Sequence, residues 1–324
     1  MLMSFQMRVG IFYHDRCFDG ACSAAVFSDF FRRNVNSQAE FSYEGLFHRA
    51  DQLFDESHFQ GVENAIVDFK YCSSPKVTWW FDHHQSAFLS EADAEHFRRD
   101  RSGKKFYDPH YRSCTKFIAN VASERFGYDA SHLKELIRWA DIIDGAQYEN
   151  AQAAIEMKEP AMKLTLVFEA ASENLTSRVI PLLASRSLEE IVTLPDVKAT
   201  FDELYRRHVD SIDVIRKLAT HRGPVVFFDL ADTDMGGYNK FIPYYLFPES
   251  LYTVAVSEAG FRTKISVGSN PWAPAEPSRN LASICEHYGG GGHARVGAIS
   301  YNPGELERAR LTAKEIVEEL AGNP

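Results

Sequence analysis

The sequence predicts an α/β fold in which an N-terminal parallel-sheet domain, with helices on both faces, precedes a smaller C-terminal α/β domain with a mixed sheet. Short runs of β-branched and aromatic residues, typical of buried strands, alternate with helical patterns in the first half. A chain of 324 residues is too long for one ordinary core. Strand patterns return after a long helical stretch, so we expect domains over 1–195 and 223–324, joined by a helical linker over 196–222.

Composition and charge narrow the class of protein. Apolar residues make up 45% and charged residues 25%, which is ordinary for a soluble globular chain, and neither a leader pattern nor a membrane-spanning run is expected. Five scattered cysteines without a Cys-x-x-Cys pair argue against a zinc ribbon or a disulfide scaffold and favour a cytoplasmic protein. The net charge of −10 argues against binding long duplex nucleic acid, but it allows a small phosphorylated ligand.

The first predicted strand, over residues 8–13, leads into a loop and a helix over residues 21–31. The loop offers four chemically active side chains, His14, Asp15, Cys17 and Asp19. Gly20 would let the backbone approach a metal or a phosphate closely. The alternative is that Asp19 is a plain helix N-cap, which would leave the neighbouring His14 unexplained.

Two further buried strands end in ionisable residues. Residues 64–69 contain Asp68, and the apolar run 77–81 ends in Asp82, His83 and His84. Taken alone, this last motif is explained about equally well by two structural histidines on a loop and by a metal-binding site. Parallel strands bring their carboxyl ends to one edge, however, so the three strand ends predict a cluster of oxygen and nitrogen ligands that needs cations. Carboxylates and imidazoles suit Mn, Fe or Zn better than Ca.

Residues 90–144 give fewer signs of a site, except for two acidic residues at the end of a predicted helix. Residues 90–111 are polar, and we expect their basic run to be a solvated loop. Ser113 is expected to cap a helix over 114–126, and a second helix covers 132–143. Asp141 and Asp144 lie at its C-terminal end, where acids are unfavourable for the helix dipole. A metal would explain them; an exposed helix tail is the alternative.

The second half is helical over 151–222, with Pro160, Pro181 and Pro195 as expected breaks. Strands are predicted over 225–230, 252–258, 261–267 and 296–301, with a hairpin turn at 258–260 and helices over 280–288 and 304–321. Four consecutive glycines precede His293 and Arg295, and their backbone N–H groups could surround an anion, with Arg262 and Arg279 adding charge. A flexible turn would explain the glycines alone.

Five segments in this order resemble the two-domain branch of the DHH phosphoesterase superfamily: YHDRCFDGACSA, NAIVDF, FDHHQ, WADIIDG and YGGGGHARVGAIS. The resemblance implies a phosphoric ester hydrolase that cleaves short phosphorylated nucleotides such as oligonucleotides, pAp, or linear or cyclic dinucleotides. Oligoribonucleases and RecJ exonucleases belong to this branch. It also implies two divalent cations, Mn²⁺ before others, that activate a water for in-line attack. The sequence is also compatible with a homodimer.

The resemblance assigns roles residue by residue. The implied metal ligands are His14, Cys17, Asp19, Asp68, His83 and Asp141, with Asp68 bridging and Asp144 as the alternative to Asp141. The implied catalytic residues are His84, which contacts the phosphate, and Asp82. The implied substrate-binding residues are Gly291, Gly292 and His293, and the nearby Arg295, Arg262 and Arg279 are added on charge.

Cys17 departs from the superfamily pattern, which has an acid at this position. A thiolate is a softer ligand that shifts preference toward Zn or Fe, and Asp15 is an alternative ligand. Two other functions stay open. One is hydrolysis of inorganic pyrophosphate or short polyphosphate, and the other is nucleotide binding without catalysis.

Overall fold

The computed structural model describes residues 7–47, 54–170, 173–235, 237–259 and 262–322. The chain forms two compact units. The first comprises Met1–Tyr148 and Lys158–Leu204, and the second comprises Glu149–Met157 and Tyr205–Pro324. The chain passes between the units at three points, and the last of them, after Leu204, falls inside one long helix, α9 (Pro195–Leu218), which covers most of the expected linker.

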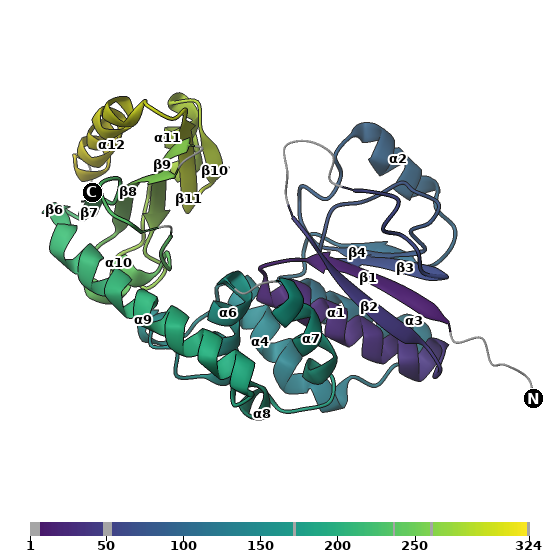
Figure 1. Ribbon diagram of the computed structural model, residues 1–324. Coiled ribbons are helices and arrows are strands. Elements are labelled where there is room, and N and C mark those ends of the chain that lie inside the picture. The colour runs from purple at the N-terminus through teal and green to yellow at the C-terminus, as the bar shows by residue number, and fades with distance from the viewer. Residues whose placement is uncertain (1–6, 48–53, 171–172, 236, 260–261, 323–324) are drawn as a thin grey trace, which may run out of the picture. The chain divides into compact units, whose positions relative to one another are not determined.

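The first unit is built on a five-stranded, all-parallel sheet in the order β2-β1-β3-β4-β5 (Figure 1). Its strands are β1 (Arg8–His14), β2 (Glu40–Leu46), β3 (Glu63–Val67), β4 (Trp79–Asp82) and β5 (Lys105–Tyr107). The register aligns Tyr13 with Val67 and Val67 with Phe81. The residues that follow in each strand direction, His14, Asp68 and Asp82, therefore lie at the same edge of the sheet.

The sheet of the first unit is buried on both faces because its strand residues alternate between two cores. Ile11, Val67 and Phe81 belong to the larger core, which contains the helices α1 (Phe18–Phe30), α3 (Cys114–Phe126), α4 (Lys134–Asp144), α6 (Pro160–Ala170), α7 (Glu173–Leu183) and α8 (Leu188–Val192). Every residue of α1 is buried, as its small side chains allow. The opposite core contains Phe12, Ile66 and Trp80, with α2 (Glu91–Arg99) packed on it through Phe97. A parallel sheet with helices on both faces is confirmed.

Two local expectations for the first unit need correction, and one strand has no counterpart among the expected elements. Residues 90–111 are not a simple loop: Ser90 caps α2 by accepting a hydrogen bond from the Asp93 N–H, and β5 follows. The sequence of this helix has no apolar pattern because its side chains are mostly charged. Its basic residues Arg98 and Arg99 pair with Glu91 and Glu95 at the surface. The edge strand β2 was not predicted. Pro181 lies inside α7, near its end, whereas Pro160 and Pro195 begin helices.

The second unit contains a six-stranded mixed sheet in the order β10-β11-β9-β8-β7-β6. Its strands are β6 (Thr220–Arg222), β7 (Val225–Asp229), β8 (Tyr252–Ala259), β9 (Arg262–Ser269), β10 (Gly291–His293) and β11 (Val296–Tyr301). Only the pair β7–β8 is parallel among these described strands. The expected hairpin joins β8 to β9, and its turn at Gly260 lies outside the described residues.

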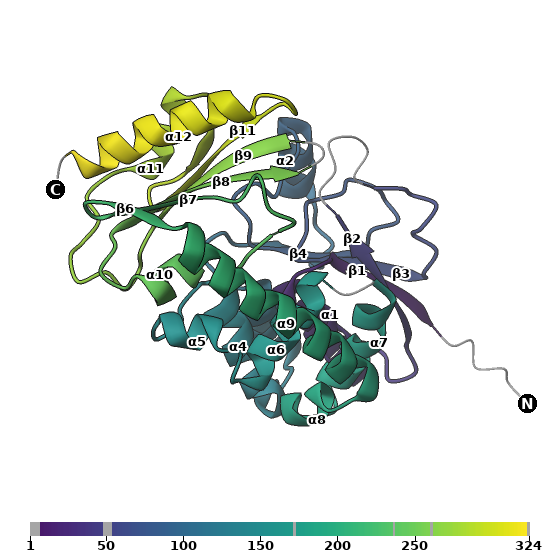
Figure 2. The ribbon, with the colours of Figure 1, turned by 60° about the vertical axis from the view of Figure 1, so that its left-hand side comes forward.

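Helices α11 (Leu281–His287) and α12 (Leu306–Ala321) pack on the sheet of the second unit and form its core with β8, β9 and β11 (Figure 2). Two short helices, α5 (Ala151–Ile155) and α10 (Ile242–Leu246), contact each other in the same unit. The smaller α/β unit with a mixed sheet is confirmed. Within the described residues, no helix is both long and apolar enough to cross a membrane.

Candidate functional site

Asp68 lies at the centre of the polar edge where β1, β3 and β4 end. It is 1% exposed, and its backbone has a positive φ of 58°, which is uncommon for a residue other than glycine. Its Oδ2 lies 3.5 Å from His14 Nδ1, and its Oδ1 lies 3.3 Å from His83 Nε2. Neither oxygen has a hydrogen-bond partner of ordinary geometry among the described residues. An uncommon backbone conformation and a buried carboxylate without ordinary hydrogen bonds indicate a functional position.

Asp19 is held by the N-terminus of a different helix. Its carboxylate accepts hydrogen bonds from the backbone N–H groups of Cys114, at 2.6 Å, and Thr115, at 3.1 Å, in the first turn of α3. A helix N-terminus favours an anion, so this contact fixes the side chain. The alternative that Asp19 is a plain N-cap is wrong, because Cys17 occupies the N-cap position of α1.

His83 points one ring nitrogen at three carboxylates. Its Nδ1 donates to the backbone carbonyl of Tyr111 at 2.9 Å, which fixes the ring and leaves Nε2 for the site. Nε2 lies near Asp68 and 3.4 Å from Asp144 Oδ2 and 3.8 Å from Asp19 Oδ2. Acidic oxygens converging on one imidazole nitrogen form a donor set that fits a cation.

Asp82 orients His84. The fully buried Asp82 accepts, through Oδ1, from the backbone N–H groups of His83 and His84 and from His84 Nδ1, at 2.8, 3.2 and 2.7 Å. This arrangement fixes the direction of the His84 ring and leaves Nε2 for other contacts. The Nδ1 atom also lies 3.8 Å from Asp68 Oδ1, so His84 belongs to the same cluster.

The crowded acids change one another's ionisation. Burial, with the charges of Asp68 and Asp144, raises the pKa of Asp19 well above its usual value. Burial and the charge of Asp68 raise the pKa of Asp144 to about 6. Burial alone would lower the pKa of His83, but the contact with Asp68 and the charge of Asp19 raise it to about 10. Carboxylates that hold each other partly protonated need added positive charge to be fully ionised.

The candidate ligands form three overlapping groups whose donor atoms lie within 4.8 Å of one another. One group is His14, Cys17 and Asp68, which we call the sulfur subsite. A second is Asp19, His83 and Asp144, which we call the oxygen-rich subsite. The third, Asp68, His83 and His84, shares residues with both. Imidazole, carboxylate and thiolate donors fit divalent transition metals, and the buried Asp68 oxygens, which accept no hydrogen bond from the described residues, support that fit.

The structure places the two acids of α4 differently from the expected order. Asp141 pairs with Lys116 Nζ at 2.8 Å and lies in none of the three groups. Asp144, one helical turn later, contacts His83. We therefore replace Asp141 by Asp144 as the proposed ligand. Asp15 is buried and lies against Gly45 of β2, where an added Cβ would come within 2.6 Å of its Cγ, and it is absent from these groups.

The four glycines of the second unit are not equivalent. Gly289 has a positive φ of 78°. A Cβ at Gly290 would come within 2.2 Å of the Ala298 carbonyl oxygen, and one at Gly292 within 2.2 Å of the Val296 carbonyl oxygen. The structure therefore requires these three glycines. Gly291 has neither a positive φ nor any atom within 4 Å of such a Cβ, so its space is open.

The basic residues near the glycines differ in their exposure and in their contacts. Arg279 Nη2 donates to the Glu319 carbonyl near the C-terminal end of α12, at 3.2 Å, which is a structural role. Arg295 is exposed, pairs with Glu276 and donates to the Pro277 carbonyl. His293 is exposed at the end of β10, with no hydrogen bond or ion pair to its side chain in the described part of the unit. Arg262 begins β9 and is exposed.

Sequence reasoning missed the partners that hold the ligands. The N–H groups of Cys114 and Thr115 and the carbonyl of Tyr111 are backbone groups, which leave no signature in the sequence. The predicted cap at Ser113 was the available signal, because it marks the helix N-terminus that holds Asp19; the cap is confirmed, with Ser113 Oγ accepting from the Lys116 N–H.

Comparisons with known proteins find the fold in solved structures. No family model and no curated protein sequence matches the chain. The chain is similar to a pGpG-specific phosphodiesterase, PggH from Vibrio cholerae, with 18% identity and a TM-score of 0.69 over 98% of this chain and 100% of that one. It is also similar to RecJ from Thermus thermophilus in complex with Mn²⁺, with 11% identity and a TM-score of 0.56 over 98% of this chain and 53% of that one.

A RecJ exonuclease bound to manganese gives 11% identity and a TM-score of 0.54 over 98% of this chain and 91% of that one. At these identities the likeness establishes the fold. The chain therefore has the two-domain α/β fold of these structures, which is the fold that the five ordered segments imply.

Proposed function

We propose that the chain is a metal-dependent phosphoesterase that hydrolyses short phosphorylated nucleotides. The observation that carries the proposal is the position of Asp68, whose two oxygens face separate donor sets at one sheet edge. A carboxylate placed in this way is suited to bridge two cations. Divalent cations bound there would supply Lewis acidity and a nucleophilic water near neutral pH.

The chain's own residues would then position the substrate's phosphoryl group. His84 is held by Asp82, and its free Nε2 can donate a hydrogen bond to a phosphoryl oxygen. Burial lowers the pKa of His84, but the hydrogen bond to Asp82 and the charge of Asp68 raise it above its ordinary value, which favours the donor form. A fixed donor aimed at developing negative charge is worth about 10²–10³ in rate.

Short nucleotides are the proposed substrates for two reasons. The similar Vibrio protein is described as a pGpG-specific phosphodiesterase, and the similar RecJ proteins as exonucleases. The second unit also offers open backbone space at Gly291 beside the exposed His293, which suits recognition of a phosphate. A net charge of −10 fits a small ligand better than a long duplex.

The test is an activity panel with the full chain, run separately with Mn²⁺ and Mg²⁺. The substrates are pAp, a linear dinucleotide, a cyclic dinucleotide, a longer single strand and inorganic pyrophosphate. We expect turnover of pAp or the linear dinucleotide in the presence of a divalent metal and none after chelation. Hydrolysis of pyrophosphate alone would replace the proposal with a pyrophosphatase, and tight nucleotide binding without turnover would replace it with a binding protein.

A further inference from the structure

We propose that the two subsites hold unlike cations: a softer metal such as Zn²⁺, Fe²⁺ or Co²⁺ at the sulfur subsite, and a harder one such as Mn²⁺ or Mg²⁺ at the oxygen-rich subsite. The inference rests on the proposed function for the presence of a metal pair. It adds that the pair is heterometallic and that Cys17 decides which ion lies where.

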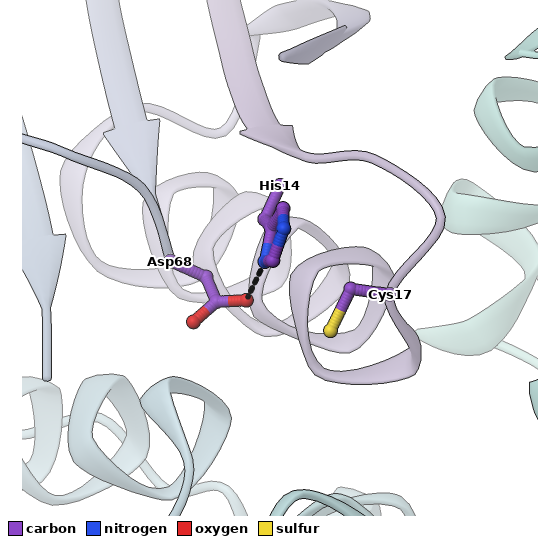
Figure 3. A group of neighbouring side chains, drawn as sticks. All are labelled: His14, Cys17 and Asp68. Atoms are coloured by element: carbon purple, nitrogen blue, oxygen red, sulfur yellow. Dashed lines mark ion pairs between the residues drawn. The ribbon is translucent and has the colours of Figure 1, made fainter. Parts of the chain in front are cut away.

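The sulfur subsite is assembled from three separate points of the first unit. His14 ends β1, Cys17 directly precedes α1, and Asp68 directly follows β3. Figure 3 shows the three side chains converging, with the His14 ring directed at the Asp68 carboxylate. Their ligand atoms lie within 4.8 Å of one another, close enough for one cation to contact all three. Asp68 supplies the independent sign of a ligand, because it is 1% exposed and its oxygens have no hydrogen-bond partners among the described residues.

A structural role does not account for Cys17. Helix N-caps favour Ser, Thr, Asp and Asn, and the Cys17 side chain makes no capping hydrogen bond. The other four cysteines are buried, with Cys22, Cys114 and Cys285 each 0% exposed and Cys72 8% exposed, as expected of residues that fill a core. Cys17 alone among the five is half-buried, at a polar strand end beside a histidine and an acid.

The donor sets of the subsites differ in softness. Thiolate selects Zn, Fe or Co over Mn and Mg, whereas two carboxylates and one imidazole accept Mn or Mg readily. When the metal–sulfur bond forms, the S–H bond breaks and its proton passes to solvent, so no oxidant or reductant is needed. Asp68 can serve both sets because its oxygens face different histidines.

The test uses Co²⁺ as a spectroscopic probe. The full chain is stripped with a chelator and titrated with Co²⁺ alone, while near-ultraviolet absorption reports cobalt–thiolate charge transfer. We expect the band to saturate at one cobalt per chain in the wild type and in the matched control Cys72→Ala, and to be absent in Cys17→Ser. Bound cobalt without the band in the wild type, or an unchanged band in Cys17→Ser, would overturn the inference.

Competition tests the selectivity. Adding Mn²⁺ to cobalt-loaded protein should fill the oxygen-rich subsite, detected by metal analysis after desalting, and leave the thiolate band in place. In Cys17→Asp the preference of the sulfur subsite for Co²⁺ over Mn²⁺ should fall by about tenfold or more. Loss of the wild-type band at Mn²⁺ concentrations equal to those of cobalt would show that the subsites do not discriminate.

The two proposals fail in different ways. Metal-dependent nucleotide hydrolysis without a thiolate band would leave the proposed function standing and remove the heterometallic centre. A Cys17-dependent band without hydrolysis of any substrate would leave the metal at the sulfur subsite standing and remove the proposed function.

Discussion

The carbonyl oxygen of His14 lies where the side chain of any residue other than glycine at position 20 would begin: a Cβ on Gly20 would fall 2.0 Å from it. Gly20 therefore lets the first turn of α1 contact the end of β1. This contact brings Asp19 and Cys17 to the strand end that carries His14. The glycine serves close helix–strand packing, and the direct approach to a metal or phosphate that the sequence suggests is not needed to explain it.

We expect Gly20→Ala to disturb this junction. The clash is with backbone, so the first turn of α1 or the end of β1 must shift, at a cost of about 1–3 kcal/mol in the free energy of unfolding. Urea denaturation measures the loss of stability, and Co²⁺ titration measures the loss of metal affinity. Gly237→Ala is the matched control, because a Cβ there has no atom within 4 Å. Equal effects of both substitutions would contradict the packing role.

Asp68→Asn is expected to remove hydrolysis while keeping the fold. Asn has the same shape and tolerates the positive φ at this position, so the backbone should not change. The amide cannot bridge cations, so we expect kcat/KM to fall by at least about 10³ and metal stoichiometry to fall with it. Circular dichroism and the urea midpoint of the metal-free protein test the fold. Retained turnover with Asn at position 68 would eliminate the bridging role.

The two acids of α4 should respond differently to the same change. Asp144→Asn removes a carboxylate that contacts His83, so metal affinity should fall by about 10–100-fold. Asp141→Asn removes the ion pair with Lys116, whose side chain is 44% exposed, so it should cost at most about 1 kcal/mol of stability and leave metal affinity unchanged. Calorimetric metal titration of both variants decides between them, and the reverse order would restore Asp141 as the ligand.

These acids also show how far sequence reasoning reaches. Strands ending in His14, Asp68 and Asp82 were predictable, because buried apolar runs are visible and parallel strands align their ends. The choice between Asp141 and Asp144 was not, because both lie at the end of one helix and the difference depends on which one faces Lys116 and which faces His83. That orientation follows from tertiary packing, which local patterns do not contain.

The elements at the edges of the first sheet could not be predicted for a related reason. The edge strand β2 and the short strand β5 lack the continuous apolar run of a central strand, and α2 has no buried residue. The glycine segment suggested an anion-binding backbone or a flexible turn, yet Gly291–His293 pairs with β11 as strand β10. Such segments take their structure from partners that are distant in the sequence.

The glycine series separates structural from recognition roles in the second unit. Gly290→Ala should destabilise the chain by about 1–3 kcal/mol, because its Cβ would contact the Ala298 carbonyl oxygen. Gly291→Ala should leave the urea midpoint unchanged, because its space is open, and should raise KM for nucleotides with little change in kcat. An unchanged KM in Gly291→Ala would remove the phosphate-recognition role of this segment.

His208 gives the second unit a pH dependence that is separate from the metal centre. The side chain is 6% exposed, and its Nε2 donates to the Ile155 carbonyl at 2.8 Å. Burial lowers the pKa of His208 below its ordinary value of about 6.5. Between the lowered pKa of His208 in the folded chain and its ordinary pKa in the unfolded chain, the unfolded chain binds the proton more readily. The contribution of neutral His208 to the free energy of unfolding is therefore complete above about pH 6.5 and is lost as the pH falls through and below that value.

His208→Gln keeps an N–H donor for the Ile155 carbonyl but removes the titratable group. We expect the variant to be less stable than the wild type at pH 7.5, because packing is altered, and to lose less further stability on transfer to pH 5.5. Urea midpoints of both proteins at the two pH values give the difference, with up to about 1.4 kcal/mol for each unit of pKa shift. Other titrating groups cancel in this comparison because both proteins contain them. Parallel pH profiles would show that His208 titrates equally in the folded and unfolded chains.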